Sequence, residues 1–259
     1  MNTEAKSLDD KNIKKVVEQR YAAIARGEVK GCCDYSKASA SEIYNIATLG
    51  QGYKASELAA IPEGANLGLG CGDPTADADL QPGQTVLDLG SGAGIDCFLA
   101  ARRVGPAGRV IGVDMTDAML EKACANAREG GFTNVEFRKG EIEKLPVESG
   151  SVDRILSNCV INLAPDKRPV FAEAYRVLKS NGILSVSDIV SFGPVPDSVR
   201  RDAELWAGCI AGAMIKEDYL ALIREAGFQK VSVVKEVVYD YLKGPDYGFA
   251  SVTVWATRL

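Results

Sequence analysis

The chain has 259 residues, of which 46% are hydrophobic and 25% are charged, and its formal net charge is −5. This length and composition are typical of one large globular domain, or of one domain with an appendage. Acidic and basic residues are interspersed without a lysine or arginine run, so we expect no nucleic-acid partner. No apolar stretch is long enough to span a bilayer, and the N-terminus does not read as a signal peptide. We therefore predict a cytoplasmic protein with no membrane contact.

Two residue counts narrow the chemistry. Histidine is absent, which excludes Ser-His-Asp and Cys-His catalysis and any metal site that uses imidazole. An odd number of cysteines in a chain expected to be cytoplasmic favours free thiols with chemical roles over a disulfide framework. The alternative is that several are small core residues. The seven positions are Cys32, Cys33, Cys71, Cys97, Cys124, Cys159 and Cys209.

The first predicted element is an amphipathic helix over residues 9–24. Its apolar side chains, among them Ile13, Val17 and Tyr21, recur at helical spacing on one face. Mixed polar, small and glycine-rich segments follow. We expect residues 1–78 to form a helical and irregular extension packed over one end of the main domain.

From Pro82 onward, short apolar runs alternate with helical patterns, which predicts βαβ units and a mostly parallel sheet. The predicted helices are residues 94–104, 117–129, 166–177 and 216–228, with Thr116 placed to cap the second. The predicted strands are residues 85–89, 109–114, 134–140, 151–158, 182–188, 230–238 and 250–259.

A glycine-rich loop, VLDLGSGAG at residues 86–94, connects the first strand to the first helix. Gly90, Gly92 and Gly94 allow a tight turn and a close approach of the backbone to a ligand. A dinucleotide-binding loop has a third glycine where this chain has Ile95, so a pyrophosphate is disfavoured. The loop, followed by a helix N-terminus, favours a smaller anionic group such as a carboxylate.

Asp114 ends the second predicted strand, 20 residues after Gly94 (114 − 94). A carboxylate at this place can accept hydrogen bonds from both ribose hydroxyls of an adenosine. The loop, the acidic strand end and their order resemble the class I S-adenosylmethionine-dependent methyltransferases. The alternatives are a nicotinamide dehydrogenase and a nucleotide-type fold without this activity. By the resemblance, the cofactor-binding residues are Asp88, Gly90, Ser91, Gly92, Asp114, Met115, Glu141, Ile142 and Asn158.

Three cysteines lie in segments unlike an ordinary core. Cys159 directly follows the fourth strand, at the carboxyl end of the sheet where open α/β folds bind ligands. Cys71 lies in the glycine-rich part of the extension, and Cys209 lies in a small-residue stretch after the fifth strand. Both segments can reach over the same crevice. Three thiols converging there would suit a soft, trigonal ligand.

These segments closely resemble arsenite S-adenosylmethionine methyltransferases over residues 31–236. The shared motifs are ANLGLGCG, VLDLGSGAG, GVDMT, GEIEKLP, SNCVINL and AGCIAGA. The resemblance implies methyl transfer from S-adenosylmethionine to arsenite, for detoxification, with Cys71, Cys159 and Cys209 as thiolate ligands of trivalent arsenic. In-line transfer to the arsenic lone pair needs positioning more than proton transfer.

The resemblance also implies that the Cys32–Cys33 pair supplies a further redox-active thiol, with thioredoxin or glutathione as reductant. A vicinal pair departs from the animal and algal pattern, so the disulfide partner stays open. The implied fold is the α/β, Rossmann-like class I methyltransferase fold. It has a mostly parallel seven-stranded sheet with helices on both faces. In the domain of residues 79–259, we expect an arsenic-binding insertion at about 190–228.

Two other functions remain open from the sequence. The first is methylation of another small molecule at carbon or oxygen, with the cysteines only structural. The second is a non-catalytic binder of arsenic or of a soft metal that retains a cofactor pocket.

Overall fold

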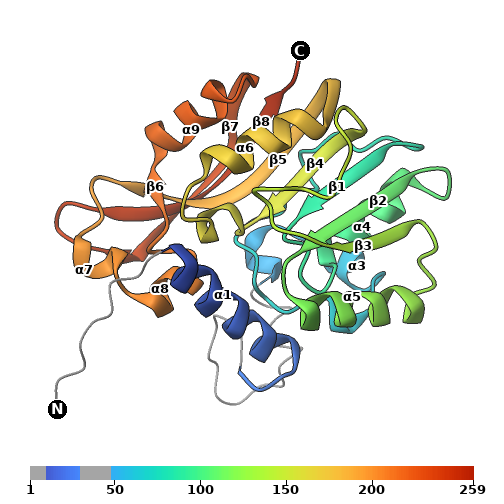
Figure 1. Ribbon diagram of the computed structural model, residues 1–259, viewed down its shortest axis with the longest axis horizontal. Coiled ribbons are helices and arrows are strands. Elements are labelled where there is room, and N and C mark those ends of the chain that lie inside the picture. The colour runs from blue at the N-terminus through green and yellow to red at the C-terminus, as the bar shows by residue number, and fades with distance from the viewer. Residues whose placement is uncertain (1–9, 30–47) are drawn as a thin grey trace.

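The computed structural model describes residues 10–29 and 48–259. A twisted sheet runs through the molecule, with helices on both of its faces and α1 at the end where the loops gather (Figure 1). The strands are β1 (Thr85–Leu89), β2 (Arg109–Asp114), β3 (Val135–Lys139), β4 (Val152–Asn158), β5 (Leu178–Phe192), β6 (Met214–Ile215), β7 (Gln229–Lys243) and β8 (Gly248–Thr257).

The strand order is β3-β2-β1-β4-β5-β8-β7, and β6 pairs with β5 beside this path. The first five strands of this order are parallel, whereas β8 is antiparallel to both of its neighbours. This is the predicted mostly parallel sheet of seven strands, with the two-residue β6 added. The chain order reverses between β1 and β4, and ligands of open α/β sheets bind beyond the carboxyl ends of the strands at such a point.

The helices vary from single turns to four turns. Among the described residues, none is long and apolar enough to cross a membrane. The helical elements are α1 (Asp10–Ala25), α3 (Ala55–Leu58), η1 (Glu63–Ala65), α4 (Ile95–Val104), α5 (Asp117–Glu129), η2 (Ile161–Leu163), α6 (Arg168–Val177), α7 (Asp197–Arg200), α8 (Ala203–Ala207) and α9 (Lys216–Glu225).

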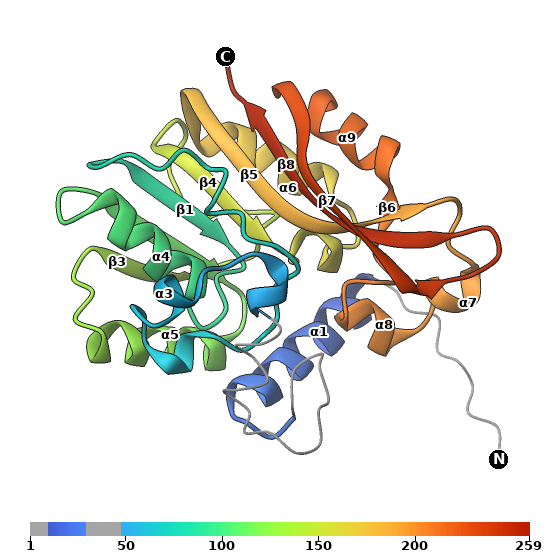
Figure 2. The same ribbon diagram turned by 180° about the vertical axis from the view of Figure 1, so that it is seen from behind.

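Alternation along the strands builds a separate core on each face of the sheet. Val86 packs with α4, whereas Leu87 and Leu89 pack in the cluster that holds α6 and α9. Successive strand side chains point to opposite faces, so a strand buried on both sides is apolar throughout. Figure 2 shows α4 and α5 on the face turned toward the viewer. The two cores fix the sheet, and therefore the positions of the strand ends that carry the site.

Most predicted elements are confirmed within a few residues, and two strands are longer than predicted. β5 continues to Phe192 and β7 to Lys243, because both pair with β8 over their full outer lengths. The periodicity of the sequence within one strand contains no information about such a partner strand. Thr116 is the N-cap residue of α5, as predicted, but its side chain makes no capping hydrogen bond.

The helix predicted for residues 9–24 is α1, which contacts α5 and α8. Its buried face carries Ile13 and Val17, which lie in the same apolar cluster as the three cysteines of interest. The helix therefore covers the loops at the carboxyl end of the sheet (Figure 1).

Candidate active site

The glycine-rich loop turns sharply between β1 and α4. Gly90, Gly92 and Gly94 have φ of +65°, +52° and +100°, a region that side chains with a Cβ rarely adopt. A Cβ on Gly90 would also overlap the side chain of Val160, the residue after Cys159. The loop after β1 is therefore packed directly against the turn after β4.

Asp114 stands at the carboxyl end of β2 and faces the same loop. Its carboxylate accepts hydrogen bonds from the backbone N–H of Gly92 at 2.9 Å and of Thr116 at 2.8 Å. Burial raises the pKa of Asp114, and these backbone hydrogen bonds oppose that rise. The bonds fix the carboxylate's orientation and leave lone pairs that can accept further hydrogen bonds from a ligand.

A cavity opens between the glycine loop, the end of β4 and α1. Its volume is about 1070 Å³, including the part that is open to solvent. The Oγ of Ser91 is buried without a hydrogen-bond partner among the described residues. A buried polar atom of this kind suits a ligand that supplies the missing bond. The predicted cofactor residues that line the cavity are Asp88, Gly90, Ser91, Gly92, Asp114, Met115, Ile142 and Asn158.

Glu141, the remaining predicted cofactor residue, lies in a neighbouring surface groove and not in this cavity. Its carboxylate accepts a hydrogen bond from the Lys14 ammonium at 2.5 Å, and the same ammonium lies 2.9 Å from the Glu143 carboxylate. Glu143 and Lys14 both line the cavity. The two glutamates together therefore hold α1 over the cavity mouth.

A buried hydrogen-bond network connects the start of α4 to the Cys71 loop. The hydroxyl of Tyr53 donates to Asp96 at 2.7 Å and accepts from the Asn158 side-chain amide at 2.8 Å. That amide also donates to the Gly72 carbonyl at 2.8 Å, and its oxygen accepts from the Cys71 N–H at 2.9 Å. Asn158 therefore holds the Cys71 loop against the cavity wall.

Two carboxyl groups that line the cavity, Asp88 and Asp96, have raised pKa values. Burial, followed by the charge of Asp96, raises the pKa of Asp88 well above its usual value. Burial raises the pKa of Asp96 to about 7. A bound cation such as an amino group would favour the ionised forms. The donor set therefore fits an adenosyl ligand that carries both ribose hydroxyls and an amino-acid end.

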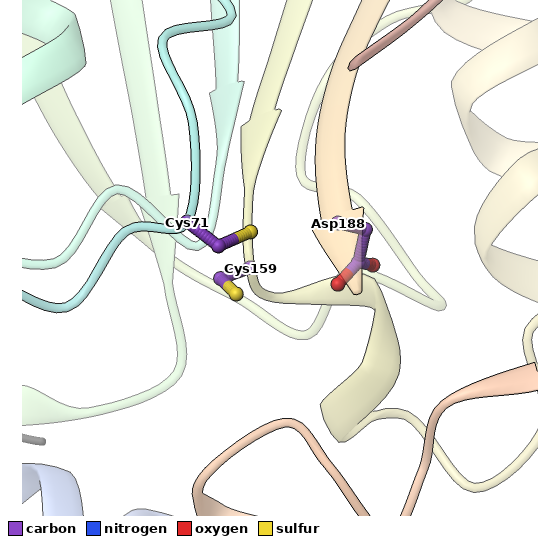
Figure 3. Close-up of side chains that lie close together, drawn as sticks. All are labelled: Cys71, Cys159 and Asp188. Carbon is purple, nitrogen blue, oxygen red and sulfur yellow. The ribbon is translucent and has the colours of Figure 1, made fainter. Parts of the chain in front are cut away.

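Cys71, Cys159 and Cys209 come together in one buried cluster. The three residues are 7%, 6% and 3% exposed, and Cys159 also lines the cavity. The Cys209 thiol donates to the Cys159 carbonyl oxygen at 2.7 Å. Figure 3 shows the thiols of Cys71 and Cys159 side by side at the end of β4. Three thiols from segments far apart in the chain therefore meet next to the cavity.

Two of these cysteines have an unfavourable backbone conformation. Cys159 has a φ of 58° and Cys209 a φ of 64°, in the left-handed region that costs a residue with a Cβ about 1–2 kcal/mol. Such conformations persist where the surrounding structure enforces them and concentrate at functional sites. Here they turn both thiols toward the same point.

The Cys71 and Cys159 thiols are held as neutral groups. The Cys209 and Cys71 thiols, together with burial, raise the pKa of Cys159 well above its usual value. Burial is the main cause that raises the pKa of Cys71. Cys71 and Cys159 are therefore protonated near neutral pH until an electrophilic centre displaces the protons.

Comparison with known proteins identifies the family. A methyltransferase domain model matches residues 80–227. The arsenite methyltransferase of Halobacterium salinarum is 48% identical, and the match covers 96% of this chain and 68% of that protein. The chain belongs to the arsenite methyltransferase family. A second family member, from Aquipseudomonas alcaligenes, is 45% identical over 61% of this chain and 47% of its own length.

A solved structure supports the same assignment. The arsenic(III) S-adenosylmethionine methyltransferase of Chlamydomonas reinhardtii matches with a TM-score of 0.68 and 35% identity, over 82% of this chain and 74% of that one. The predicted family and the class I methyltransferase fold are thus confirmed, and S-adenosylmethionine is the methyl donor. The chain spans about two thirds of the Halobacterium relative and less than half of the Aquipseudomonas one.

Asp188, on β5, is a site residue that the sequence analysis missed. One of its carboxylate oxygens and the sulfurs of Cys71 and Cys159 all lie within 4.8 Å of one another. Burial raises the pKa of Asp188 to about 7, and the charge of Lys167, a residue that is only 4% exposed, opposes that rise. The segment SVSD reads as an ordinary strand end, and only its place at the carboxyl edge of the sheet could have drawn attention to it.

The other cysteines separate into two groups. Cys32 and Cys33, the predicted redox pair, lie outside the described residues. Cys97 is buried in α4, where its thiol donates to Asp88 at 3.2 Å. Cys124 is partly exposed on α5, away from the thiol cluster. These two positions carried no predicted role.

Proposed function

We propose that this protein transfers a methyl group from S-adenosylmethionine to arsenite held by the thiolates of Cys71, Cys159 and Cys209. The observation that carries the proposal is the meeting of these three thiols beside the cavity of the glycine loop. Trivalent arsenic is soft and takes three sulfur ligands in a pyramid, which leaves its lone pair on the opposite face. The names of the family members in Halobacterium and Aquipseudomonas support arsenite as the acceptor.

In this proposal, the cavity residues hold the methyl donor. Asp114 accepts hydrogen bonds from the ribose hydroxyls, and Asp88 and Asp96 face the amino-acid end. When bound, S-adenosylmethionine supplies a sulfonium methyl group that the arsenic lone pair takes by in-line displacement, leaving S-adenosylhomocysteine. The close contact of Gly90 with Val160 sets the distance between the donor loop and Cys159. Most of the rate enhancement therefore comes from positioning.

The raised pKa of Cys71 and Cys159 does not obstruct arsenite binding. Each As–OH group that leaves takes one thiol proton and departs as water, so three thiols and one arsenite give a neutral tris-thiolate and three waters. No base in the chain needs to keep the proton. The dry surroundings of the cluster then protect the As–S bonds from the reverse reaction.

Methyl transfer raises arsenic from the trivalent to the pentavalent state, so two electrons are needed to restore it. We propose that a pair of thiols supplies them by closing as a disulfide, with Cys32 or Cys33 as one partner. Thioredoxin or glutathione would then reopen it. Placement in the cytoplasm is part of this proposal, because thiols stay reduced there. The described cysteines are all free, which suits such a compartment.

The direct test is formation of S-adenosylhomocysteine and methylated arsenic by the purified, reduced protein, with and without arsenite. We expect arsenite-dependent product, its loss in Cys159→Ser, and its retention in Cys124→Ser, which changes a cysteine outside the cluster. Turnover without arsenite that survives Cys159→Ser would point to another small-molecule acceptor. Arsenite binding without any product would point to a binding protein that keeps a cofactor pocket.

A further inference from the structure

Asp188 gives the thiol cluster a donor that trivalent arsenic does not need. Figure 3 shows its carboxylate, from β5, at the same edge of the sheet as the thiols of Cys71 and Cys159. These three side chains offer two sulfurs and one oxygen within 4.8 Å of one another, and all three are buried. Pyramidal arsenic is complete with three sulfurs, so the carboxylate calls for another explanation.

The Asp188 carboxylate is held in place from several sides. Its Oδ2 accepts hydrogen bonds from the Tyr219 hydroxyl at 3.2 Å and from the Asn162 N–H at 3.1 Å, and its Oδ1 accepts from the Ile189 N–H at 2.9 Å. Metal-binding carboxylates are typically oriented by such outer hydrogen bonds. The remaining lone pairs of a fixed carboxylate can then serve as a ligand.

The charges of the site also suit a divalent cation. With both thiols ionised, Cys71, Cys159 and Asp188 carry three negative charges. A divalent cation neutralises two, and the buried Lys167 ammonium, which acts on Asp188, neutralises the third. A zinc-like ion takes four tetrahedral donors from thiolate and carboxylate groups. The fourth position falls to Cys209 or to a water.

We propose that Cys71, Cys159 and Asp188 also bind a thiophilic divalent cation of the zinc class, which competes with arsenite for the two thiols. Binding of the cation does not depend on the proposed function, whereas the competition rests on it. The two ligands differ in one respect that can be tested. The cation uses the Asp188 oxygen, and arsenic uses only sulfur.

The test uses Co²⁺ as a spectroscopic probe of the reduced full chain, with Zn²⁺ added afterwards to displace it. A sulfur-ligated tetrahedral site gives sulfur-to-cobalt charge-transfer bands and strong visible bands. We expect these bands in the wild type and in Cys124→Ser, and their loss in Cys71→Ser. Asp188→Asn should lower the Co²⁺ affinity about tenfold or more, and by a larger factor than any change in arsenite affinity. Co²⁺ affinity equal to that of the wild type in Asp188→Asn would overturn the inference.

A second variant guards against misfolding of Asp188→Asn, in which an amide NH2 donor replaces one of the two oxygens that accept hydrogen bonds from Asn162, Tyr219 and Ile189. Tyr219→Phe keeps the ring and removes one hydrogen bond that orients the carboxylate, so Co²⁺ affinity should fall by about tenfold. In turnover, Zn²⁺ should raise the apparent KM for arsenite without changing that for S-adenosylmethionine. Inhibition that arsenite cannot relieve would refute the competition.

The two proposals can fail separately. Asp188-dependent Co²⁺ binding in a protein that shows no arsenite turnover would overturn the proposed function alone. Arsenite turnover with no cobalt–sulfur bands would overturn the cation site alone.

Discussion

Replacement of Tyr53 by phenylalanine tests whether the buried network holds the site together. The Tyr53 side chain is 3% exposed, and its hydroxyl connects Asp96 to Asn158. Tyr53→Phe keeps the ring and deletes both hydrogen bonds. All three residues line the cavity, and in the variant Asp96 and Asn158 each lose one hydrogen-bond partner within the protein.

The expected loss of stability depends on pH. Burial raises the pKa of Asp96 to about 7, and the Tyr53 hydrogen bond holds it below a still higher value. At about one pH unit below that pKa, both of the lost hydrogen bonds are between neutral groups. The two bonds together contribute about 2 kcal/mol to stability. Above it, the bond to the ionised carboxylate contributes about 1.5–3 kcal/mol by itself. The destabilisation should therefore grow by about 1 kcal/mol as Asp96 ionises.

The direction of this pH dependence follows from the linkage between proton binding and folding. A carboxyl with a raised folded-state pKa makes the protein less stable as the pH rises from the unfolded-state pKa through the folded one. The variant should have a higher Asp96 pKa than the wild type, so its decline is steeper and continues further. The difference in stability between the wild type and the variant therefore grows as the pH rises above the Asp96 pKa of about 7.

Urea denaturation at one pH on each side of 7 measures this difference, provided that the m-value stays unchanged. Tyr175→Phe is the matched control. Tyr175 lies on α6, and its ring packs against Phe228, away from the cavity. It should show a small loss that does not vary with pH. A loss below about 0.5 kcal/mol in Tyr53→Phe, or one equal at both pH values, would refute the reasoning.

Three further predictions concern the strained turns and the thiols. Cys159→Gly should be more stable in urea than Cys159→Ala by about 1 kcal/mol, because glycine relieves the φ of 58°; equal stabilities would contradict the strain argument. Gly90→Ala should lose about 1–3 kcal/mol more than Gly150→Ala, since both have positive φ but only the first Cβ would overlap Val160; calorimetry that finds equal losses would exclude this contact. At neutral pH, iodoacetamide should label Cys124 before Cys159, whose pKa is raised, and labelling of Cys159 should accelerate as the pH rises; peptide mass spectrometry with the reverse order would disprove a protonated cluster.

The class of fold and the donor loop could be predicted from local features of the sequence. Alternating strand and helix patterns specified a parallel sheet, because each element buries its own apolar face at a characteristic period. The positive φ of Gly90, Gly92 and Gly94 follows from the residue type. Asp114 could be placed because a residue that ends a strand must lie at the sheet edge.

The partners of these residues could not be predicted in the same way. Nothing near Tyr53 in the sequence identifies Asp96 or Asn158 as its partner, since the three come together only when the extension packs on the sheet. Glu141 and Glu143 are two positions apart, yet Glu143 lines the cavity and Glu141 lies in the adjoining groove.

The sequence by itself predicted that this chain belongs to the arsenite methyltransferase family, because the glycine loop and each of the motifs around Cys71, Cys159 and Cys209 is a continuous stretch of residues. Only the tertiary structure decided that these cysteines share one cluster and that Asp188 joins them. The physical reason is that the carboxyl end of β4, the part of β5 beside it, the Cys71 loop and the turn after α8 meet through sheet pairing and helix packing. Those contacts join residues far apart in the chain, and local patterns in the sequence do not predict them.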